Sequence, residues 1–262
     1  MKAISIRVEH VKASQYSGQR AHDLRNGHIP DYVSRDRIDE NSLLVCPPPA
    51  EHVRELNARA AARANRRAPN QSAAIAASGV LTFGVEAQAI VGALDKKEQD
   101  ERIRRSVEMV ASRFGTEVIG LVVHRDESAI HAHFMLRAIC DDGQAFSRKC
   151  TRQALSEMQD IAAEAFKDLE ITRGKRKIDR IRDGEDKGKW VHKTVAELHR
   201  DLPADLAKKQ QQLEQVDKKL AASERKLAEV MRKLKAGEGE VEKLQKLKER
   251  YEKEIARFQK AA

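Results

Sequence analysis

Three histidines and a glutamate lie close together near the middle of this chain. An apolar run over residues 118–123 ends at His124, and a second apolar run begins with His131 and His133. The period-two alternation predicts a strand, a short loop and a second strand. Residues two apart on a strand share a face, and the loop turns back with His124 and Glu127. We therefore expect three imidazoles and one carboxylate to converge on one face of a sheet.

Such a convergence predicts a metal site rather than a solvated strand face, which is the usual setting for a lone pair of histidines. Three neutral imidazoles suit zinc, manganese, iron or copper and do not choose among these ions. No cysteine lies near the cluster, which argues against a structural zinc site and favours an open coordination position for catalysis. Ala132, Phe134 and Leu136 are expected on the opposite, apolar side of the same strand.

Length and composition limit the class of protein. The 262 residues allow one α/β domain with an appendage, and the net charge of +9 with a pI of about 9.4 favours a polyanionic partner, most often nucleic acid. The three cysteines, Cys46, Cys140 and Cys150, have no CxxC spacing and predict reduced thiols. The sequence has no signal-like start and no apolar run of membrane-spanning length. We expect a cytoplasmic protein without a membrane segment.

The elements that would hold the cluster follow from periodicity and turn residues. Strands are expected over residues 3–11, 42–45, 79–84, 118–124 and 131–139, and helices over residues 51–67, 85–114 with a break near Asp95, and 151–169. Residues 14–30 are expected to form a long irregular connection rich in reactive side chains. The mixture predicts an α+β fold with a largely antiparallel central sheet flanked by helices.

Basic residues outside the cluster are candidates for phosphate contacts, although a solvated helix face is their alternative role. Arg20 lies in the expected irregular connection, and a second group lies on the helix expected over residues 51–67. A third group falls in a basic loop expected over residues 173–189. The members of the second and third groups are Arg59, Arg63, Arg66 and Arg67, and Lys175, Arg176 and Lys177.

From about residue 204 the sequence takes on a heptad pattern. Leucines recur every seven residues at positions 206, 213, 220, 227 and 234, and further apolar residues lie three positions on. This predicts a coiled coil over residues 201–262, following a catalytic domain over residues 1–200. Gly237 and Gly239 indicate either a local break or a hairpin between two helices. The expected role is a homodimer contact or docking of another partner, and the alternative is a solvated tail helix.

The segment from His124 to His133 resembles the third motif, H-x-D-E-x-x-P-H-x-H, of plasmid mobilisation relaxases of the Mob/Pre (MobV) group, which belong to the HUH endonucleases. The segment His22-Asp23-Leu24-Arg25 resembles their first motif, H-N-x-R, and Asn41-Ser42-Leu43-Leu44 loosely matches the second, N-Y-E-L. Residues 192–195 are similar to a segment that follows the catalytic domain in these relaxases. Two residues depart from the motifs: Ile130 stands in place of proline, and Asp23 in place of asparagine.

The resemblance implies a function and a set of roles. The protein would nick one strand of plasmid DNA at an origin of transfer and remain covalently attached to the 5′-phosphate. The resemblance implies His124, His131 and His133 as ligands of Mn²⁺ or Mg²⁺, and His22 as nucleophile with Tyr16 or Tyr32 as alternates. It also implies that Glu127 orients or activates the nucleophile and that Arg25 holds phosphate or supports the His22 loop. Asp126 points away from the cluster if the loop stays extended, so we expect it to have a structural role. The alternatives are a catalytically silent DNA-binding accessory protein and a hydrolase of another phosphoester.

Overall fold

The computed structural model describes residues 2–184, 195–235 and 241–259 and divides into two compact units, Met1–Arg180 and Ile181–Ala262. Each unit is considered by itself. The boundary expected near residue 200 falls inside a long helix of the second unit, α8 (Val195–Lys235).

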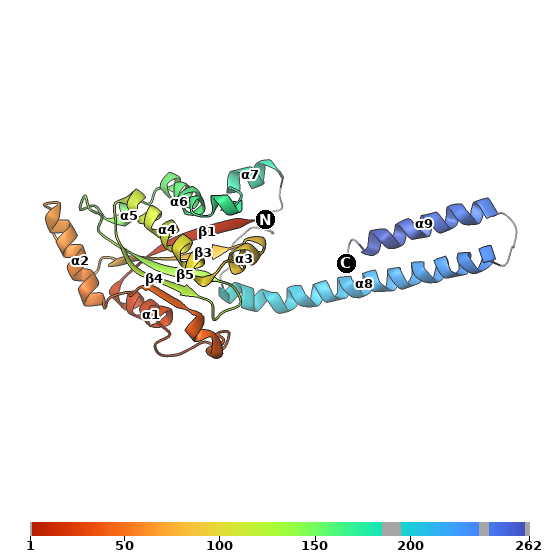
Figure 1. Cartoon of the computed structure of the whole chain (residues 1–262), viewed down its shortest axis with the longest axis horizontal. Coiled ribbons are helices and arrows are strands. Elements are labelled where there is room, and N and C mark those ends of the chain that lie inside the picture. Colours follow the sequence, from red (N-terminus) through yellow and green to blue (C-terminus); the bar gives the residue numbers. More distant parts are fainter. Residues whose placement is uncertain (1, 185–194, 236–240, 260–262) are drawn as a thin grey trace. The chain divides into compact units, whose positions relative to one another are not determined.

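A six-stranded sheet forms the centre of the first unit, in the order β2-β4-β5-β3-β1-β6 (Figure 1). Its four longer strands are β1 (Ala3–Val11), β3 (Ala76–Phe83), β4 (Val118–His124) and β5 (His131–Arg137). The short strands β2 (Ser42–Val45) and β6 (Thr172–Arg173) lie at the two edges. All pairs are antiparallel except β1 with β6, so the predicted α+β class and the largely antiparallel sheet are confirmed.

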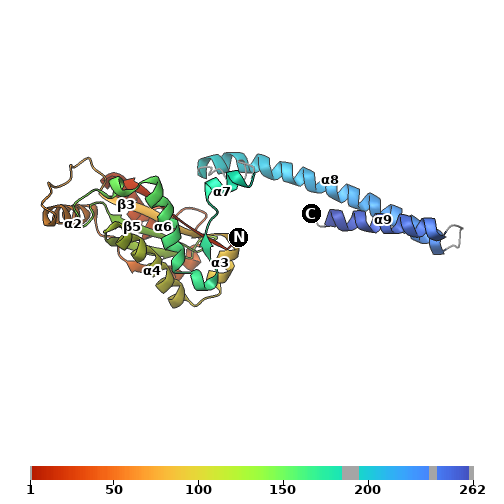
Figure 2. The ribbon, with the colours of Figure 1, turned by 90° about the horizontal axis from the view of Figure 1, so that it is seen from above.

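Helices cover both faces of this sheet. On one face α4 (Lys96–Phe114) and α6 (Arg152–Glu164) pack side by side over the strands (Figure 2), together with α3 (Val85–Gly92) and α5 (Phe146–Lys149). On the other face lie α1 (Ala13–Asp23) and α2 (Ala50–Arg63). The larger apolar cluster lies under α4 and α6, and a smaller one under α1 and α2.

Strand β5 separates these two environments by its alternation. Ala132, Phe134 and Leu136 are fully buried in the larger cluster beneath α4 and α6, as the sequence predicts. His131 and His133 therefore point to the opposite face, the one that α1 and α2 share. Burial of the apolar side chains of β5 therefore determines the face to which His131 and His133 point.

Two expected segments differ from the structure. Residues 14–30 are not irregular throughout, because α1 occupies Ala13–Asp23. This helix buries Tyr16 and Asp23, seven residues apart, and its other positions are largely polar, so it lacks an apolar stripe. The basic loop expected over residues 173–189 begins with β6 and contains α7 (Lys177–Arg182). The break near Asp95 does occur, and the Asp95 carboxylate caps α4 by accepting from the Glu98 N–H at 2.8 Å.

The second unit contains α8 and α9 (Val241–Gln259), which pack against each other. Ser223 and Val230 are buried there, and the Lys226 ammonium lies 5.6 Å from the centre of the Tyr251 ring. Leu206 and Leu213 of α8 remain 58% and 48% exposed. A coiled-coil homodimer or other partner therefore stays a prediction. Gly237, Gly239 and residues 190–194 lie outside the described residues. In the part of the chain that the structure describes, no helix has the length and apolarity to cross a membrane.

Gly79 of β3 pairs with Phe134 of β5, and the Phe134 ring occupies the space where a side chain of residue 79 would lie. A Cβ at this position would lie 2.1 Å from the Phe134 ring, whereas a Cβ at Gly18 of α1 would meet nothing within 4 Å. We expect Gly79→Ala to lower the free energy of unfolding by about 1–3 kcal/mol, because the buried ring must move. Gly18→Ala should raise it by up to about 1 kcal/mol through helix propensity. Urea titrations of both variants measure this, and equal stability of Gly79→Ala and the parent would contradict it.

Candidate metal centre

The β4–β5 hairpin brings the three histidines together. His124 and His131 are directly opposite each other in the register of the two strands, and His133 follows two residues later on the same face. The ring centroids are 5.3 Å apart for His124 and His131, and 5.0 Å apart for each of these with His133. The histidines that the sequence brings forward as ligands thus form one cluster.

Two of these rings have one nitrogen fixed by a backbone carbonyl. His124 Nε2 lies 3.0 Å from the Asp23 carbonyl oxygen, and His131 Nδ1 lies 3.0 Å from the Ala129 carbonyl oxygen. A carbonyl only accepts, so each of these nitrogens carries the proton and donates. The other nitrogen of each ring then keeps a lone pair, as a metal ligand requires. The donor chemistry of these two side chains therefore fits a divalent cation.

Burial keeps the imidazoles of His124 and His133 neutral. It lowers the pKa of His124 to about 4 and the pKa of His133 well below the usual range. A neutral imidazole is the form that binds metal, so acid competes weakly for these side chains.

His22 reaches the cluster from the last turn of α1. Its ring centroid is 5.8 Å from that of His124 and 5.4 Å from that of His133, and burial lowers its pKa. Among the described residues, potential ligand atoms come within 4.8 Å of one another in two groups: His22, His124 and His133, and His124, Glu127 and His131. The end of α1 also carries the partial negative charge of its last carbonyls, which favours a cation nearby.

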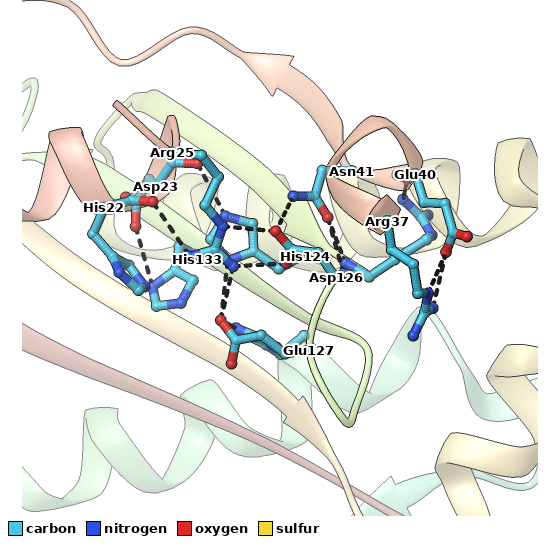
Figure 3. Close-up of polar contacts among 12 residues, drawn as sticks. His22, Asp23, Arg25, Arg37, Glu40, Asn41, His124, Asp126, Glu127 and His133 are labelled. Carbon is cyan, nitrogen blue, oxygen red and sulfur yellow. Dashed lines mark hydrogen bonds and ion pairs between the residues drawn. The ribbon is translucent and has the colours of Figure 1, made fainter. Parts of the chain in front are cut away.

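Arg25 links this helix end to the loop of the hairpin (Figure 3). Its guanidinium donates to both carboxylate oxygens of Asp126 at 2.7 Å and to Glu127 Oε1 at 2.8 Å. Burial opposes its charge, but the hydrogen bonds with the two acids raise its pKa overall. The side chain is only 5% exposed, so this geometry favours the role of supporting the His22 loop over the role of holding phosphate. Arg25 Nη2 also lies 3.1 Å from His124 Nδ1, and a cation on that nitrogen would replace this contact.

Asp126 does not point away from the cluster, as an extended loop would have it, but toward Arg25. Its side chain is fully buried, and besides Arg25 it accepts a hydrogen bond from Asn41 Nδ2 at 2.8 Å. Burial opposes ionisation, yet these donors outweigh it and lower the pKa of Asp126. The loop turns inward because a buried guanidinium needs a buried counter-ion.

Asn41 and Arg125 are positioning residues to which the sequence analysis assigns no role. Asn41 Oδ1 accepts from the Arg125 N–H at 2.7 Å, so the residue just before β2 is bonded to the loop of the β4–β5 hairpin. The buried Arg125 side chain donates to Gln99 and Asp100 of α4 and to Ser42, at 2.7–2.9 Å. The available signal is the place of Asn41 in the loosely matched second motif.

Ile130, which stands where the motif has proline, forms two backbone hydrogen bonds with the side chain of Gln88. Its N–H donates to Gln88 Oε1 at 3.0 Å, and Gln88 Nε2 donates to its carbonyl oxygen at 2.6 Å. Proline has no N–H, so it could not make the first of these bonds. Gln88 of α3 therefore fixes the loop just before His131.

The two alternate nucleophiles, Tyr16 and Tyr32, differ from His22 in burial and in their contacts. Tyr16 is fully buried and donates its hydroxyl to the Pro48 carbonyl at 2.8 Å, and burial raises its pKa further. Tyr32 is 62% exposed. Of the three candidates His22, Tyr16 and Tyr32, His22 is the one with ring contacts to the predicted ligands.

The predicted phosphate-binding residues do not form one surface. Arg59, Arg63, Arg66 and Arg67 lie on α2 and the loop after it. Arg20 donates to the Pro47 carbonyl at 2.7 Å, and Arg176 pairs with Asp160 at 3.3 Å. Lys175 also has an interaction partner, and the side chain of Lys177 lies outside the described part.

The site thus combines a largely antiparallel sheet with paired histidines on β5, a third on β4 and a fourth at the end of α1, as the resemblance to relaxases implies. The sequence profile of the plasmid recombination enzymes called Mob_Pre matches residues 1–187. This chain belongs to that family, which confirms the resemblance to the Mob/Pre group.

Solved structures support the same fold. The MobM relaxase domain bound to plasmid pMV158 oriT DNA, in a Mn-bound crystal structure at pH 5.5, matches with a TM-score of 0.61 at 19% identity, over 76% of this chain and 98% of that one. A Mn-bound structure at pH 4.6 matches with a TM-score of 0.59 at 20% identity, over 76% and 99%. At this identity the likeness establishes the fold. No individually curated protein matches the sequence significantly.

The Arg25–Asp126 pair predicts a specific stability effect. Asp126→Asn should lower the free energy of unfolding by about 3 kcal/mol, since it removes the fully buried carboxylate that binds the Arg25 guanidinium through two hydrogen bonds and leaves only the contact with Glu127. A depressed pKa stabilises the folded state above the unfolded value of about 3.9, and this contribution is lost as pH falls through the folded pKa. The difference between variant and parent, measured by urea unfolding with a chelator present, should therefore shrink in acid.

The matched control is Glu40→Gln, which removes the exposed pair of Glu40 with Arg37. Solvent screens that pair, so its removal should change stability little. If the two variants have the same stability at neutral pH, the buried pair does not hold the loop.

Proposed function

We propose that this protein is a relaxase that nicks one strand of plasmid DNA at an origin of transfer and keeps the 5′-phosphate on His22. The observation that carries the proposal is the position of the His22 ring against His124 and His133, with centroid separations of 5.8 and 5.4 Å. A nucleophile beside a prospective cation site is the arrangement that phosphoryl transfer requires.

The reaction follows from the groups present. A neutral nitrogen of His22 attacks the scissile phosphorus, a P–N bond forms, and the P–O3′ bond breaks. The released 3′-oxygen takes up a proton, and the strand remains attached through a phosphoramidate. Burial lowers the pKa of His22, which keeps the attacking nitrogen unprotonated at neutral pH.

His124, His131 and His133 would hold Mn²⁺ or Mg²⁺, and the bound ion would polarise a phosphoryl oxygen. Glu127 Oε1 lies 3.9 Å from His124 Nδ1 and 3.8 Å from His131 Nε2, close enough to orient the nucleophile or accept a proton. Arg25 would fix the end of α1 through Asp126. Mn²⁺ on the MobM domain at pH 4.6 supports the choice of ion, because burial of the histidines here also weakens competition by protons.

The open part of the sheet face beside His133 would receive the DNA strand. Val80 of β3 pairs with His133, and Arg7 of β1 pairs with Val80, so Arg7 lies on the same face about 10 Å away. Arg7 is exposed and could contact a phosphate, although its place in the first strand does not single it out by sequence. The MobM domain bound to oriT DNA supports this use of the fold.

The decisive experiment incubates the protein with supercoiled plasmid carrying its own origin and Mn²⁺. We expect open circles with protein on the 5′ end, and we expect His22→Ala to abolish them while DNA binding persists. The matched control is His28→Ala, which removes an exposed histidine of the following loop. If the parent yields no nicked product but binds DNA, the accessory-protein alternative is correct. Turnover of small phosphodiesters without DNA would favour the hydrolase alternative.

The pH dependence of the same assay identifies the nucleophile. Protonation removes the attacking lone pair, and the lowered pKa of His22 places the acid limb below the ordinary imidazole value of about 6.5. Cleavage should therefore stay constant from neutral pH down to that value and fall below it, at saturating Mn²⁺. An acid limb well above the ordinary value would contradict a buried histidine nucleophile.

The arginines at the end of α2 predict a salt-dependent effect on DNA binding. Replacing Arg63, Arg66 and Arg67 by alanine should weaken binding of all sequences alike, because phosphate contacts carry no base information. The slope of log affinity against log salt should fall by about 0.7–0.9 for each phosphate that the variant no longer neutralises. The control replaces Lys97, Arg105 and Arg113, exposed on α4 at the opposite face, and removes the same charge. Equal slopes for the two triple variants would exclude α2 from the DNA interface.

A further inference from the structure

Asp23 is the last residue of α1, directly after the proposed nucleophile, and its side chain is 3% exposed. The first motif that this segment resembles has asparagine at this position, so the carboxylate is a feature of this chain. The proposed reaction does not use it.

The backbone of Asp23 contacts one predicted ligand. Its carbonyl oxygen lies 3.0 Å from His124 Nε2. This carbonyl is free to accept because the last four carbonyls of a helix have no partner within the helix. The end of α1 thus fixes the tautomer of His124.

The side chain of Asp23 faces a second predicted ligand. Its Oδ1 lies 3.5 Å from His133 Nδ1, longer than a good hydrogen bond, and accepts from Gln19 Nε2 at 2.6 Å. Gln19 Nε2 is also 3.2 Å from His133 Nδ1, and an amide nitrogen only donates, so in this contact Nδ1 accepts. The shorter contact of the amide is with the carboxylate, so Gln19 holds Asp23 in place beside the ring (Figure 3 shows Asp23 pointing to His133).

We propose that Asp23 is a positioning residue that orients two metal ligands at once, His124 through its carbonyl oxygen and His133 through its carboxylate. A cation on His133 Nε2 requires the ring proton on Nδ1, and that N–H would then turn from the Gln19 donor to the Asp23 carboxylate, 3.5 Å away. A carboxylate in this place also makes the imidazole a stronger ligand than an amide would. The inference rests on the proposed metal site and adds a determinant of its affinity.

Asp23→Asn tests the carboxylate alone, because the shape and the backbone contact with His124 are retained. We expect Mn²⁺ affinity, measured by calorimetric titration of the full chain without DNA, to fall by about 10- to 100-fold. Thermal stability of both proteins in chelator shows whether the variant is folded. A lower affinity with unchanged metal-free stability separates ligand orientation from a general structural role.

The control is Asp31→Asn, which removes the same charge from an exposed residue of the next loop and should leave Mn²⁺ affinity unchanged. Gln19→Leu provides a second variant, since freeing the carboxylate should weaken affinity in the same direction. If the parent binds Mn²⁺ and Asp23→Asn binds it equally well, the inference is wrong while the metal site stands. If the parent does not bind Mn²⁺, both the metal site and the inference fail.

Discussion

The bidentate pair of Arg25 with Asp126 is the interaction on which the geometry of the site depends. It joins residues 101 positions apart in sequence, one just after the helix that carries His22 and the other in the hairpin between His124 and His131. Both side chains are almost fully buried, so each charge is costly to leave without the other, and Glu127 adds a second carboxylate to Arg25. The need to keep these two charges paired therefore holds His22 beside the predicted metal ligands. The helix that carries His22 is largely polar, so apolar packing could hold it less firmly.

The histidines around this pair must not all carry a positive charge. Four imidazoles lie within reach of one another, and protonating several of them would place like charges side by side in a buried setting. Burial resolves this by lowering the pKa of His22, His124 and His133. A neutral imidazole can bind a cation or act as a nucleophile. Burial therefore supports both the proposed metal site and the proposed attack by His22.

The sequence predicted the hairpin and its histidines because both depend on local periodicity. An apolar strand with alternating faces determines where His131 and His133 point, and pairing with β4 determines where His124 lies. Helix α1 was not predictable in this way, since it is stabilised by burial of Tyr16 and by ionic contacts after its end. The contacts of Asn41 and Gln88 with the loop join segments 85 and 42 residues apart, which no local pattern encodes.

The two departures from the motifs both fit their surroundings in the folded chain. Here Ile130 brings an N–H that proline lacks, and Gln88 accepts it while donating to the same residue's carbonyl. Asp23 brings a charge that asparagine lacks, and Gln19 and His133 lie against it. Each substitute is matched by a neighbouring side chain, and both leave the three predicted ligands in place. The departures therefore preserve the arrangement of histidines that the proposed cleavage needs.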